Sequence, residues 1–163
     1  MVKKTIEIHS KQETEAFGLK LGSLLNEGMC ITLSGDLGAG KTTLTKSIGK
    51  AIGVNKTINS PTFTILKIYH GKFPLYHIDA YRLEGIEQDL GFDEFIEGDG
   101  VCVIEWPDYM ANQLPDQRLE ITIHNGSDEN REFICTALGS KYEEIVEKLI
   151  RKHYVWIPRT NSL

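Results

Sequence analysis

The sequence predicts one α/β domain of three layers, with a mixed sheet and an antiparallel hairpin at the edge of that sheet. Three observations lead to this fold class. A short apolar run at residues 29–34 is followed by a glycine-rich turn and then by a helical pattern over 41–52. A second run of buried-strand type occupies residues 101–104. Residues 119–123 and 133–137 alternate apolar and polar side chains, which predicts the hairpin.

The chain before this central strand reads as a strand followed by a helix. Residues 5–9 alternate and lead into Ser10-Lys11-Gln12-Glu13, a capping box in which the Ser10 hydroxyl and the Glu13 carboxylate satisfy free helix amides. Apolar residues then recur at helical spacing up to Gly28, a residue suited to a left-handed helix end. We therefore expect the first helix to stop at Gly28.

The later part of the chain is less regular. Residues 63–69 and 75–78 read as strands joined by a turn at 70–72, and residues 84–95 as short helical pieces broken at Gly91. Ser140-Lys141-Tyr142-Glu143 is a second capping box that opens a helix. Residues 154–163 match no pattern, so we expect a single domain over residues 1–153 and a C-terminal tail of unassigned role at 154–163.

Length and composition exclude several classes of protein. The 163 residues suffice for one domain with a core that needs no disulfide. With 40% hydrophobic and 25% charged residues, the chain is neither disordered nor fibrous. Its 18 Lys and Arg against 23 Asp and Glu give a net charge of −5, which argues against a stand-alone nucleic-acid-binding domain. Contact with RNA inside a larger assembly stays open.

The three cysteines and the N-terminus predict the compartment. Cys30, Cys102 and Cys135 are an odd number without a C-x-x-C pair, which predicts reduced, buried thiols. Lys3 and Lys4 are followed by an alternating strand instead of an apolar signal core, and no window approaches about 18 consecutive apolar residues. We expect a cytoplasmic protein that does not span a membrane.

Residues 35–42, Gly-Asp-Leu-Gly-Ala-Gly-Lys-Thr, match G-x-x-x-x-G-K-[ST] in full, between a predicted strand and a predicted helix. The glycines let successive amides turn toward one concavity that holds phosphate oxygens, and the helix N-terminus adds positive charge. Lys41 is placed to reach the β- and γ-phosphates and the Thr42 hydroxyl to bind Mg²⁺. The motif predicts a phosphate-loop NTPase-like domain; the alternative is a glycine turn with an incidental lysine.

Two predicted strands end in a carboxylate, Asp79 and Glu105. Ligands of open α/β sheets sit at the carboxyl ends of strands, so both side chains could reach the loop. Either could hold Mg²⁺ through water or polarise the attacking water; the alternative is a solvated residue at a strand end. Residues 59–64 lie where many phosphate-loop hydrolases carry a switch segment with a threonine that senses the γ-phosphate, although a Ser-Pro-Thr turn is commonly only a turn.

Four motifs occur in a specific order. They are Gly35-Asp36-Leu37-Gly38-Ala39-Gly40-Lys41-Thr42-Thr43, Ser60-Pro61-Thr62-Phe63-Thr64, His77-Ile78-Asp79-Ala80-Tyr81-Arg82-Leu83 and Val103-Ile104-Glu105-Trp106-Pro107, followed by Leu114-Pro115-Asp116. In this combination the chain resembles, from Ser10 to about Ala137, the TsaE family (also called YjeE), the ATPase component of the bacterial tRNA threonylcarbamoyladenosine machinery.

The resemblance implies ATP and Mg²⁺ binding with slow intrinsic hydrolysis. It also implies action together with the TsaB and TsaD proteins, with tRNA reached indirectly through that complex and with neither DNA nor a membrane as partner. The net charge of −5 is consistent with phosphate contacts that come mainly from the partners.

The resemblance also implies roles for individual residues. Lys41, Thr62, Asp79 and Glu105 form the catalytic set, in which Thr62 is the switch residue and Asp79 a catalytic or water-positioning carboxylate. Thr42 and Glu105 serve the metal. Ser10 and Arg131 approach the adenine side without a motif that anchors them. The nucleotide-binding set is Ser10, Gly35, Asp36, Gly38, Ala39, Gly40, Lys41, Thr42, Thr43, Trp106 and Arg131.

Three other functions are alternatives to a TsaE-like ATPase. A small-molecule kinase usually lines its phosphates with several arginines, whereas Arg82 is the only arginine before Arg118. A GTPase reads guanine with Asn-Lys-x-Asp, and the only Asn-Lys, at Asn55-Lys56, lacks the Asp. A nucleotide-gated assembly module with incidental hydrolysis needs the same site as an enzyme, so the sequence does not separate the two.

Overall fold

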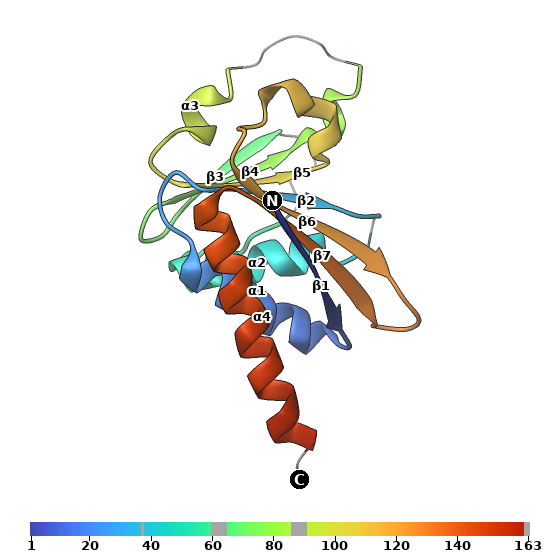
Figure 1. Cartoon of the computed structure of the whole chain (residues 1–163). Coiled ribbons are helices and arrows are strands. Elements are labelled where there is room, and N and C mark those ends of the chain that lie inside the picture. The colour runs from blue at the N-terminus through green and yellow to red at the C-terminus, as the bar shows by residue number, and fades with distance from the viewer. Residues whose placement is uncertain (37, 60–64, 86–90, 162–163) are drawn as a thin grey trace.

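The computed structural model describes residues 1–36, 38–59, 65–85 and 91–161, the last ten of them by their backbone alone (Figure 1). A mixed sheet of seven strands runs through these residues in the order β1-β7-β6-β2-β5-β4-β3. The strands are β1 (Val2–Ile8), β2 (Cys30–Ser34), β3 (Leu66–His70), β4 (Pro74–Asp79), β5 (Val101–Glu105), β6 (Arg118–Asn125) and β7 (Arg131–Leu138). The α-helices are α1 (Lys11–Leu24), α2 (Lys41–Ile52), α3 (Asp93–Ile96) and α4 (Ser140–Asn161), and the short 3₁₀ helices are η1 (Ala80–Leu83) and η2 (Pro107–Gln113).

The sheet is mixed and has antiparallel edges, as predicted, but the predicted hairpin is not itself at an edge. A second antiparallel hairpin, β3–β4, forms the opposite edge. Strand β2 pairs in parallel with β5 and β6, and β4 pairs in parallel with β5. Strands β6 and β7 form the predicted antiparallel hairpin. Strand β1 then pairs antiparallel with β7 along its whole length and takes the edge. The reason is that Ile6 and Ile8 must be buried, and the free side of β7 offers them a place in the core.

Helices cover both faces of the sheet, which confirms the predicted layers. Figure 1 shows α1, α2 and α4 on one face and α3, η1 and η2 on the other. Each face has its own apolar core. The first core includes Leu21, Ile31, Leu33, Leu44, Ile48, Val103 and Val146. The second includes Tyr76, Ile78, Leu83, Ile96, Cys102, Ile104 and Met110.

The Ser10 cap of α1 is present, but Glu13 bonds the residue before the cap, and the predicted end of α1 is wrong. The Ser10 hydroxyl accepts a hydrogen bond from the Glu13 amide at 3.1 Å, and the Glu13 carboxylate accepts one from the His9 amide at 3.3 Å. Helix α1 ends at Leu24 because Leu25 turns into extended backbone and enters the core. Gly28 does adopt a left-handed conformation (φ 87°), but in the turn that leads into β2.

Helix α4 begins differently from the prediction and is longer. Its first residue is Ser140, and the carbonyl of Gly139 accepts from the Glu143 amide at 3.0 Å, so Ser140 is a helical residue and not the cap. The helix runs to Asn161 and projects beyond the rest of the domain (Figure 1). The backbone of residues 154–161 therefore continues α4, and the role of this tail stays open.

The middle of the chain agrees with the prediction where the structure describes it. A turn at residues 71–73 joins β3 to β4, and Asp79 is the last residue of β4. Strand β3 begins at Leu66; the predicted strand residues 63 and 64 lie outside the described residues. Of the expected helical pieces, α3 is present and Gly91 lies before it with φ 75°, while residues 86–90 lie outside the description.

Two glycines of α1 allow this helix to lie directly against α2. A Cβ at Gly18 would stand 2.5 Å from the Ser47 Cβ. A Cβ at Gly22 would stand 2.6 Å from the Ala51 Cβ and 2.8 Å from the Ile48 carbonyl oxygen. Real Cβ atoms do not come this close, so the two helix backbones would have to separate. The spacing of α1 from α2 therefore depends on glycine at these two positions.

We expect Gly22→Ala to destabilise the protein by about 1–3 kcal/mol, because the added methyl overpacks a contact with backbone atoms. In a free helix the same change stabilises by about 1 kcal/mol, so the sign of the effect identifies the contact. Urea unfolding measures the difference. Gln12→Ala, at an exposed position of α1, is the matched control. A Gly22→Ala protein at least as stable as the parent would contradict the close packing.

The cysteines are free and buried, as the sequence predicts: Cys30, Cys102 and Cys135 are each at most 1% exposed. Burial raises the pKa of the Cys135 thiol to about 12, which keeps it protonated. Among the helices of the described residues, none is both long and apolar enough to cross a membrane.

Candidate functional site

The glycine-rich loop joins the carboxyl end of β2 to the first turn of α2. Gly40 has φ 107° and immediately precedes α2, a conformation that favours glycine strongly. At Gly35 (φ 151°) a Cβ would stand 2.8 Å from the Ile123 carbonyl oxygen of β6. The loop therefore packs against the neighbouring strand only because a side chain is absent there, and the N-terminus of α2 is directed at the same place.

Lys41 is folded back over this loop. Its ammonium donates a hydrogen bond to the Gly35 carbonyl at 2.6 Å and lies 3.8 Å from the centre of the Trp106 ring. The residue is 5% exposed. Burial lowers the pKa of the Lys41 ammonium, and the nearby carboxylates of Glu105, Asp79 and Asp36 act in the opposite direction. The largely buried Lys41 ammonium is thus held beside the loop by a neutral carbonyl and an aromatic ring, which a negatively charged ligand could replace.

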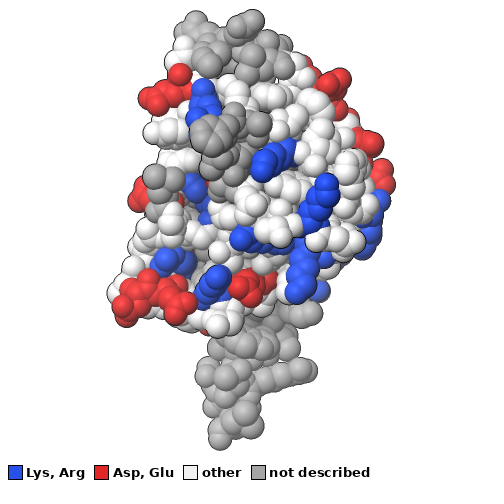
Figure 2. Space-filling view, turned by 180° about the vertical axis from the view of Figure 1, so that it is seen from behind, with Lys and Arg blue, Asp and Glu red and all other residues white. Residues whose placement is uncertain are grey.

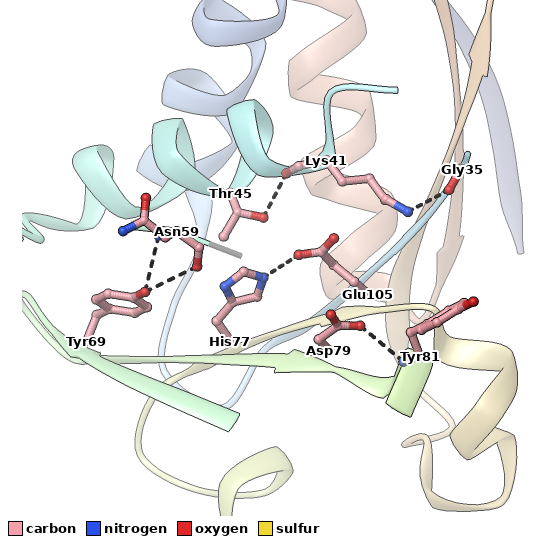
Figure 3. A network of polar contacts seen from close by, with 9 residues as sticks. All are labelled: Gly35, Lys41, Thr45, Asn59, Tyr69, His77, Asp79, Tyr81 and Glu105. Carbon is pink, nitrogen blue, oxygen red and sulfur yellow. Dashed lines mark hydrogen bonds and ion pairs between the residues drawn. The ribbon is translucent and has the colours of Figure 1, made fainter. Parts of the chain in front are cut away.

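The two strand-end carboxylates lie side by side near this cation. Asp79 of β4 is paired with Glu105 of β5 in the parallel register, so both carboxylates are at the same edge of the sheet and on the face that carries α2 (Figure 3). Glu105 is 5% exposed and Asp79 is half-buried. The Asp79 carboxylate also caps η1, because Oδ1 accepts from the Tyr81 amide at 3.1 Å. The structure therefore brings together Lys41, Asp79 and Glu105.

Burial raises the pKa of Asp79. The bond from the Tyr81 amide lowers it, the Glu105 carboxylate raises it, and His77 and Arg82 lower it. A folded-state pKa above the unfolded one favours the neutral acid in the folded protein. That contribution to stability is fully present below the ordinary value of 3.8 and is lost as the pH rises through the folded-state pKa. At pH 7 the ionised Asp79 carboxylate is therefore a cost to the fold.

We expect Asp79→Asn to raise the melting temperature of the nucleotide-free protein at pH 7, because the amide keeps the oxygen that caps η1 and carries no charge. The difference in melting temperature should disappear on acidification below about pH 4, where the parent's Asp79 is neutral like the asparagine of the variant. Calorimetry at the two pH values tests this, with Asp108→Asn at an exposed position as the control. A variant that melts below the parent at pH 7 would contradict the sign of the shift.

His77 contacts the site, and sequence reasoning missed it. Its Nε2 lies 2.5 Å from Oε2 of Glu105, and the imidazole is 0% exposed (Figure 3). Within the described residues, Nδ1 is buried and has no hydrogen-bond partner. A signal was available: His77 shares its face of β4 with Leu75, at a position where a buried strand is normally apolar.

Trp106 follows Glu105 in a left-handed conformation, φ 57° and ψ 53°. Its amide donates to the Leu33 carbonyl at 3.2 Å, so the end of β5 is tied to the end of β2 just before the loop. The indole packs against the Tyr81 ring with 5.2 Å between centroids, and Tyr81 contacts Tyr109. This geometry places the indole beside Lys41, as expected for a residue next to the loop.

Arg131 contacts the loop, and Ser10 lies at the start of α1. Ile8 pairs with Arg131 across β1 and β7, and Arg131 donates from Nε to the Ala39 carbonyl at 3.2 Å. The start of α1 is also tied to the β6–β7 turn, because the Lys11 amide donates to Glu129 at 3.1 Å. Arg131 thus contacts the loop directly, while the Ser10 hydroxyl is engaged as the cap of α1.

The remaining predicted residues are distributed as follows. Asp36 is exposed in the loop, and its carbonyl accepts from the Ala39 amide at 3.1 Å. Thr42 and Thr43 are half-buried in the first turn of α2. Thr43 lines a hollow between α1 and α2 together with Lys11, Lys46 and Lys50. Thr62 lies outside the described residues.

The site offers oxygen donors of the kind that a hard cation binds. Thr42 supplies a hydroxyl, and Glu105 and Asp79 supply carboxylates, the ligand types that Mg²⁺ takes. In the described part of the chain, no group of three or more His, Cys, Asp and Glu side chains could hold a metal ion. These donors therefore fit Mg²⁺ only if phosphate oxygens and water complete its coordination, as is usual at nucleotide sites.

The fold and the site define a class. This is a mixed-sheet α/β protein whose glycine-rich loop, buried lysine and paired carboxylates meet at the carboxyl ends of parallel strands, where open α/β sheets bind their ligands. Comparison with known proteins narrows the class. The family model described as "Threonylcarbamoyl adenosine biosynthesis protein TsaE" matches residues 8–133, and the chain belongs to the TsaE family.

Individual relatives agree with this assignment. The "tRNA threonylcarbamoyladenosine biosynthesis protein TsaE" of Bacillus subtilis is 46% identical over 141 residues, which are 86% of this chain and 89% of the relative. The protein of the same description from Treponema pallidum is 44% identical over 126 residues, 76% of this chain and 93% of the relative. The crystal structure of YdiB from Bacillus subtilis superimposes with a TM-score of 0.77 at 37% identity and covers 93% of this chain and 97% of that chain.

Proposed function

We propose that this protein binds ATP with Mg²⁺, hydrolyses it slowly on its own, and supports tRNA threonylcarbamoyladenosine biosynthesis together with TsaB and TsaD. Family membership supports the pathway. The observation that carries the ATPase activity is the convergence of Lys41, Asp79 and Glu105 at the glycine-rich loop. In this proposal the protein is the ATP-dependent component of a tRNA-modifying assembly.

The loop and the first turn of α2 bind the phosphates in this proposal. Backbone amides of residues 38–43 donate to phosphate oxygens in this proposal, that of Ala39 after it leaves the Asp36 carbonyl, and the N-terminus of α2 favours the negative charge of the phosphates. Lys41 leaves the Gly35 carbonyl and the Trp106 ring and binds the β- and γ-phosphates, since a phosphate is a better partner for an ammonium than a neutral carbonyl. Arg131 keeps the loop in place from the side through the Ala39 carbonyl.

The carboxylates serve metal and water. Thr42 and Glu105 would hold Mg²⁺, which supplies charge stabilisation at the phosphates when bound. Asp79 is half-buried next to Glu105, and the raised pKa of its carboxyl makes it a better proton acceptor than an exposed aspartate. We assign Asp79 to the orientation of the attacking water. Thr62 is proposed as the switch residue on the basis of the motif alone.

We expect slow turnover because Arg131 and Arg82, the arginines with contacts to the loop or to Asp79, are already engaged. Arg131 donates to the carbonyls of Ala39, Asp128 and Asn130, so its guanidinium is committed to backbone. The positive charge of Arg82 lowers the pKa of the Asp79 carboxyl. An arginine that stabilises the γ-phosphate in the transition state is worth about 10³–10⁵ in rate, and we propose that docking of TsaB and TsaD supplies such a cation or orders residues 60–64.

The surface is compatible with a partner-dependent role. Figure 2 shows one face on which Lys and Arg recur across the middle, with Asp and Glu mainly toward the margins. The chain as a whole is nevertheless acidic, with a net charge of −5. We therefore assign the main contacts with tRNA phosphates to the partners.

The test is ATP turnover by the protein alone, with reconstituted TsaB and TsaD, and with both proteins and tRNA. We expect slow hydrolysis alone and a clear acceleration with the partners. Fast hydrolysis by the isolated chain that the partners leave unchanged would contradict the proposal. Phosphate transferred to a metabolite would favour a small-molecule kinase instead. Partner assembly that needs bound ATP but not its hydrolysis would favour a nucleotide-gated assembly module.

A further inference from the structure

We propose that His77 is a positioning residue of this site: it donates a hydrogen bond from Nε2 to Oε2 of Glu105 and so reserves Oε1 of that carboxylate for the metal ion. The inference rests on the proposed function, in which Glu105 holds Mg²⁺. The observation behind it is the 2.5 Å separation of Nε2 and Oε2 inside the protein.

The parallel register of β4 and β5 produces this contact. Asp79 is paired with Glu105, and His77 is paired with Val103, two residues earlier on both strands. Because side chains two residues apart share a face, His77 lies on the same face as Asp79 and Glu105. Figure 3 shows the imidazole and the Glu105 carboxylate pointing toward one another beneath α2. The ring therefore approaches the carboxylate from the side opposite the loop.

Burial makes the bond strong and directional. The side chains of His77 and Glu105 are 0% and 6% exposed, so water competes little for either partner. A hydrogen bond to an ionised carboxylate is shorter and stronger than a neutral one, and the low dielectric of the interior strengthens it further. An ionised carboxylate only accepts, so Nε2 carries the proton. One rotamer of Glu105 is thereby selected before any ligand arrives.

The second ring nitrogen supports a role of the imidazole in this contact. In the described residues, Nδ1 is buried without a hydrogen-bond partner. Buried polar atoms without partners destabilise a fold, so an apolar side chain would serve packing better at this place. An apolar residue could not form the hydrogen bond to Glu105, so this bond accounts for a histidine at position 77.

The experiment uses a pair of variants with nearly the same shape. His77→Gln keeps an N–H donor on a side chain of suitable length, and His77→Met has similar length without a donor. The affinity for Mn²⁺ at saturating ADP is measured by electron paramagnetic resonance. We expect His77→Met to weaken Mn²⁺ binding about 10- to 100-fold, the range for partners of metal ligands, and His77→Gln to recover most of it.

Two further measurements separate positioning from a general structural effect. ADP affinity in EDTA should stay within about twofold of the parent in both variants, because the phosphate contacts are unchanged. Combined with Glu105→Gln, His77→Met should cause no additional loss of Mn²⁺ affinity, because His77 acts through Glu105. His77→Leu replaces His77→Met if the latter does not fold.

Each result points to one conclusion. If Glu105→Gln binds Mn²⁺ as the parent does, the proposed metal role of Glu105 is wrong. If Glu105→Gln is weakened but His77→Met is not, the inference is wrong while the proposed function stands. Equal losses in His77→Met and His77→Gln, or additive losses in the double variant, would assign His77 to packing and overturn the inference.

Discussion

Lys41→Ala should weaken ATP binding by about 100-fold or more, because the phosphates lose charge-assisted hydrogen bonds made in a partly desolvated site. The ammonium is buried, and its counter-charges are the carboxylates of Asp36, Asp79 and Glu105. A nucleotide brings a larger negative charge to the same position. Titration with a fluorescent ATP analogue measures the loss.

The same change removes two contacts of the nucleotide-free protein, the bond to the Gly35 carbonyl and the contact with the Trp106 ring. Folding must therefore be verified by circular dichroism before binding is compared. Lys46→Ala, in the exposed part of the same helix, is the matched control and should bind ATP nearly as the parent does. Undiminished affinity in a folded Lys41→Ala protein would refute the assignment of the glycine-rich loop to phosphate binding.

Asp79→Ala and Glu105→Ala should each reduce ATP hydrolysis by about 100-fold or more while nucleotide affinity stays within about tenfold. The loop and Lys41 supply most of the binding, whereas the two carboxylates act on metal and water, whose contribution appears in the transition state. Their pairing across β4 and β5 places both at the same edge of the sheet. Steady-state turnover and ADP titration on the same preparations separate the two effects.

Asp108→Ala serves as the control for these two variants, because Asp108 is an exposed carboxylate in η2, close in sequence to Glu105. It should leave turnover unchanged. If Asp79→Ala and Glu105→Ala both hydrolyse ATP at the parental rate, the paired carboxylates are structural and other groups carry the hydrolysis.

Several features of the site were predictable because short-range chemistry determines them. The bounds of α2 agree with the prediction at both ends, since Gly40 and Gly53 adopt the left-handed conformations that their sequence positions suggest. The Ser10 cap of α1 depends on a hydroxyl three residues from its amide partner. Asp79 and Glu105 end two apolar strands, and parallel pairing is enough to bring such ends together.

Other features depend on contacts between residues that are far apart in the sequence. Strand β1 takes the edge because residues 2–8 pair with residues 131–137 of β7, far along the chain. Local alternation does not determine which strand a given strand will join. Helix α1 lies close to α2 through Gly18 and Gly22, whose importance depends on what faces them. The prediction for Gly28 was wrong because the burial of Leu25 ended α1 earlier.

The amino-acid sequence by itself therefore determined the α/β class with its mixed sheet, the position of the glycine-rich loop, the two strand-end carboxylates and the membership of the TsaE family. Each of these depends on residues close together along the chain or on an ordered set of motifs. Only the tertiary structure decided that His77 bonds to Glu105, that Lys41 rests on Trp106 and that Arg131 holds Ala39. These contacts join side chains across separate strands and loops. Their partners are selected by strand register and burial, two properties that exist only once the chain has folded.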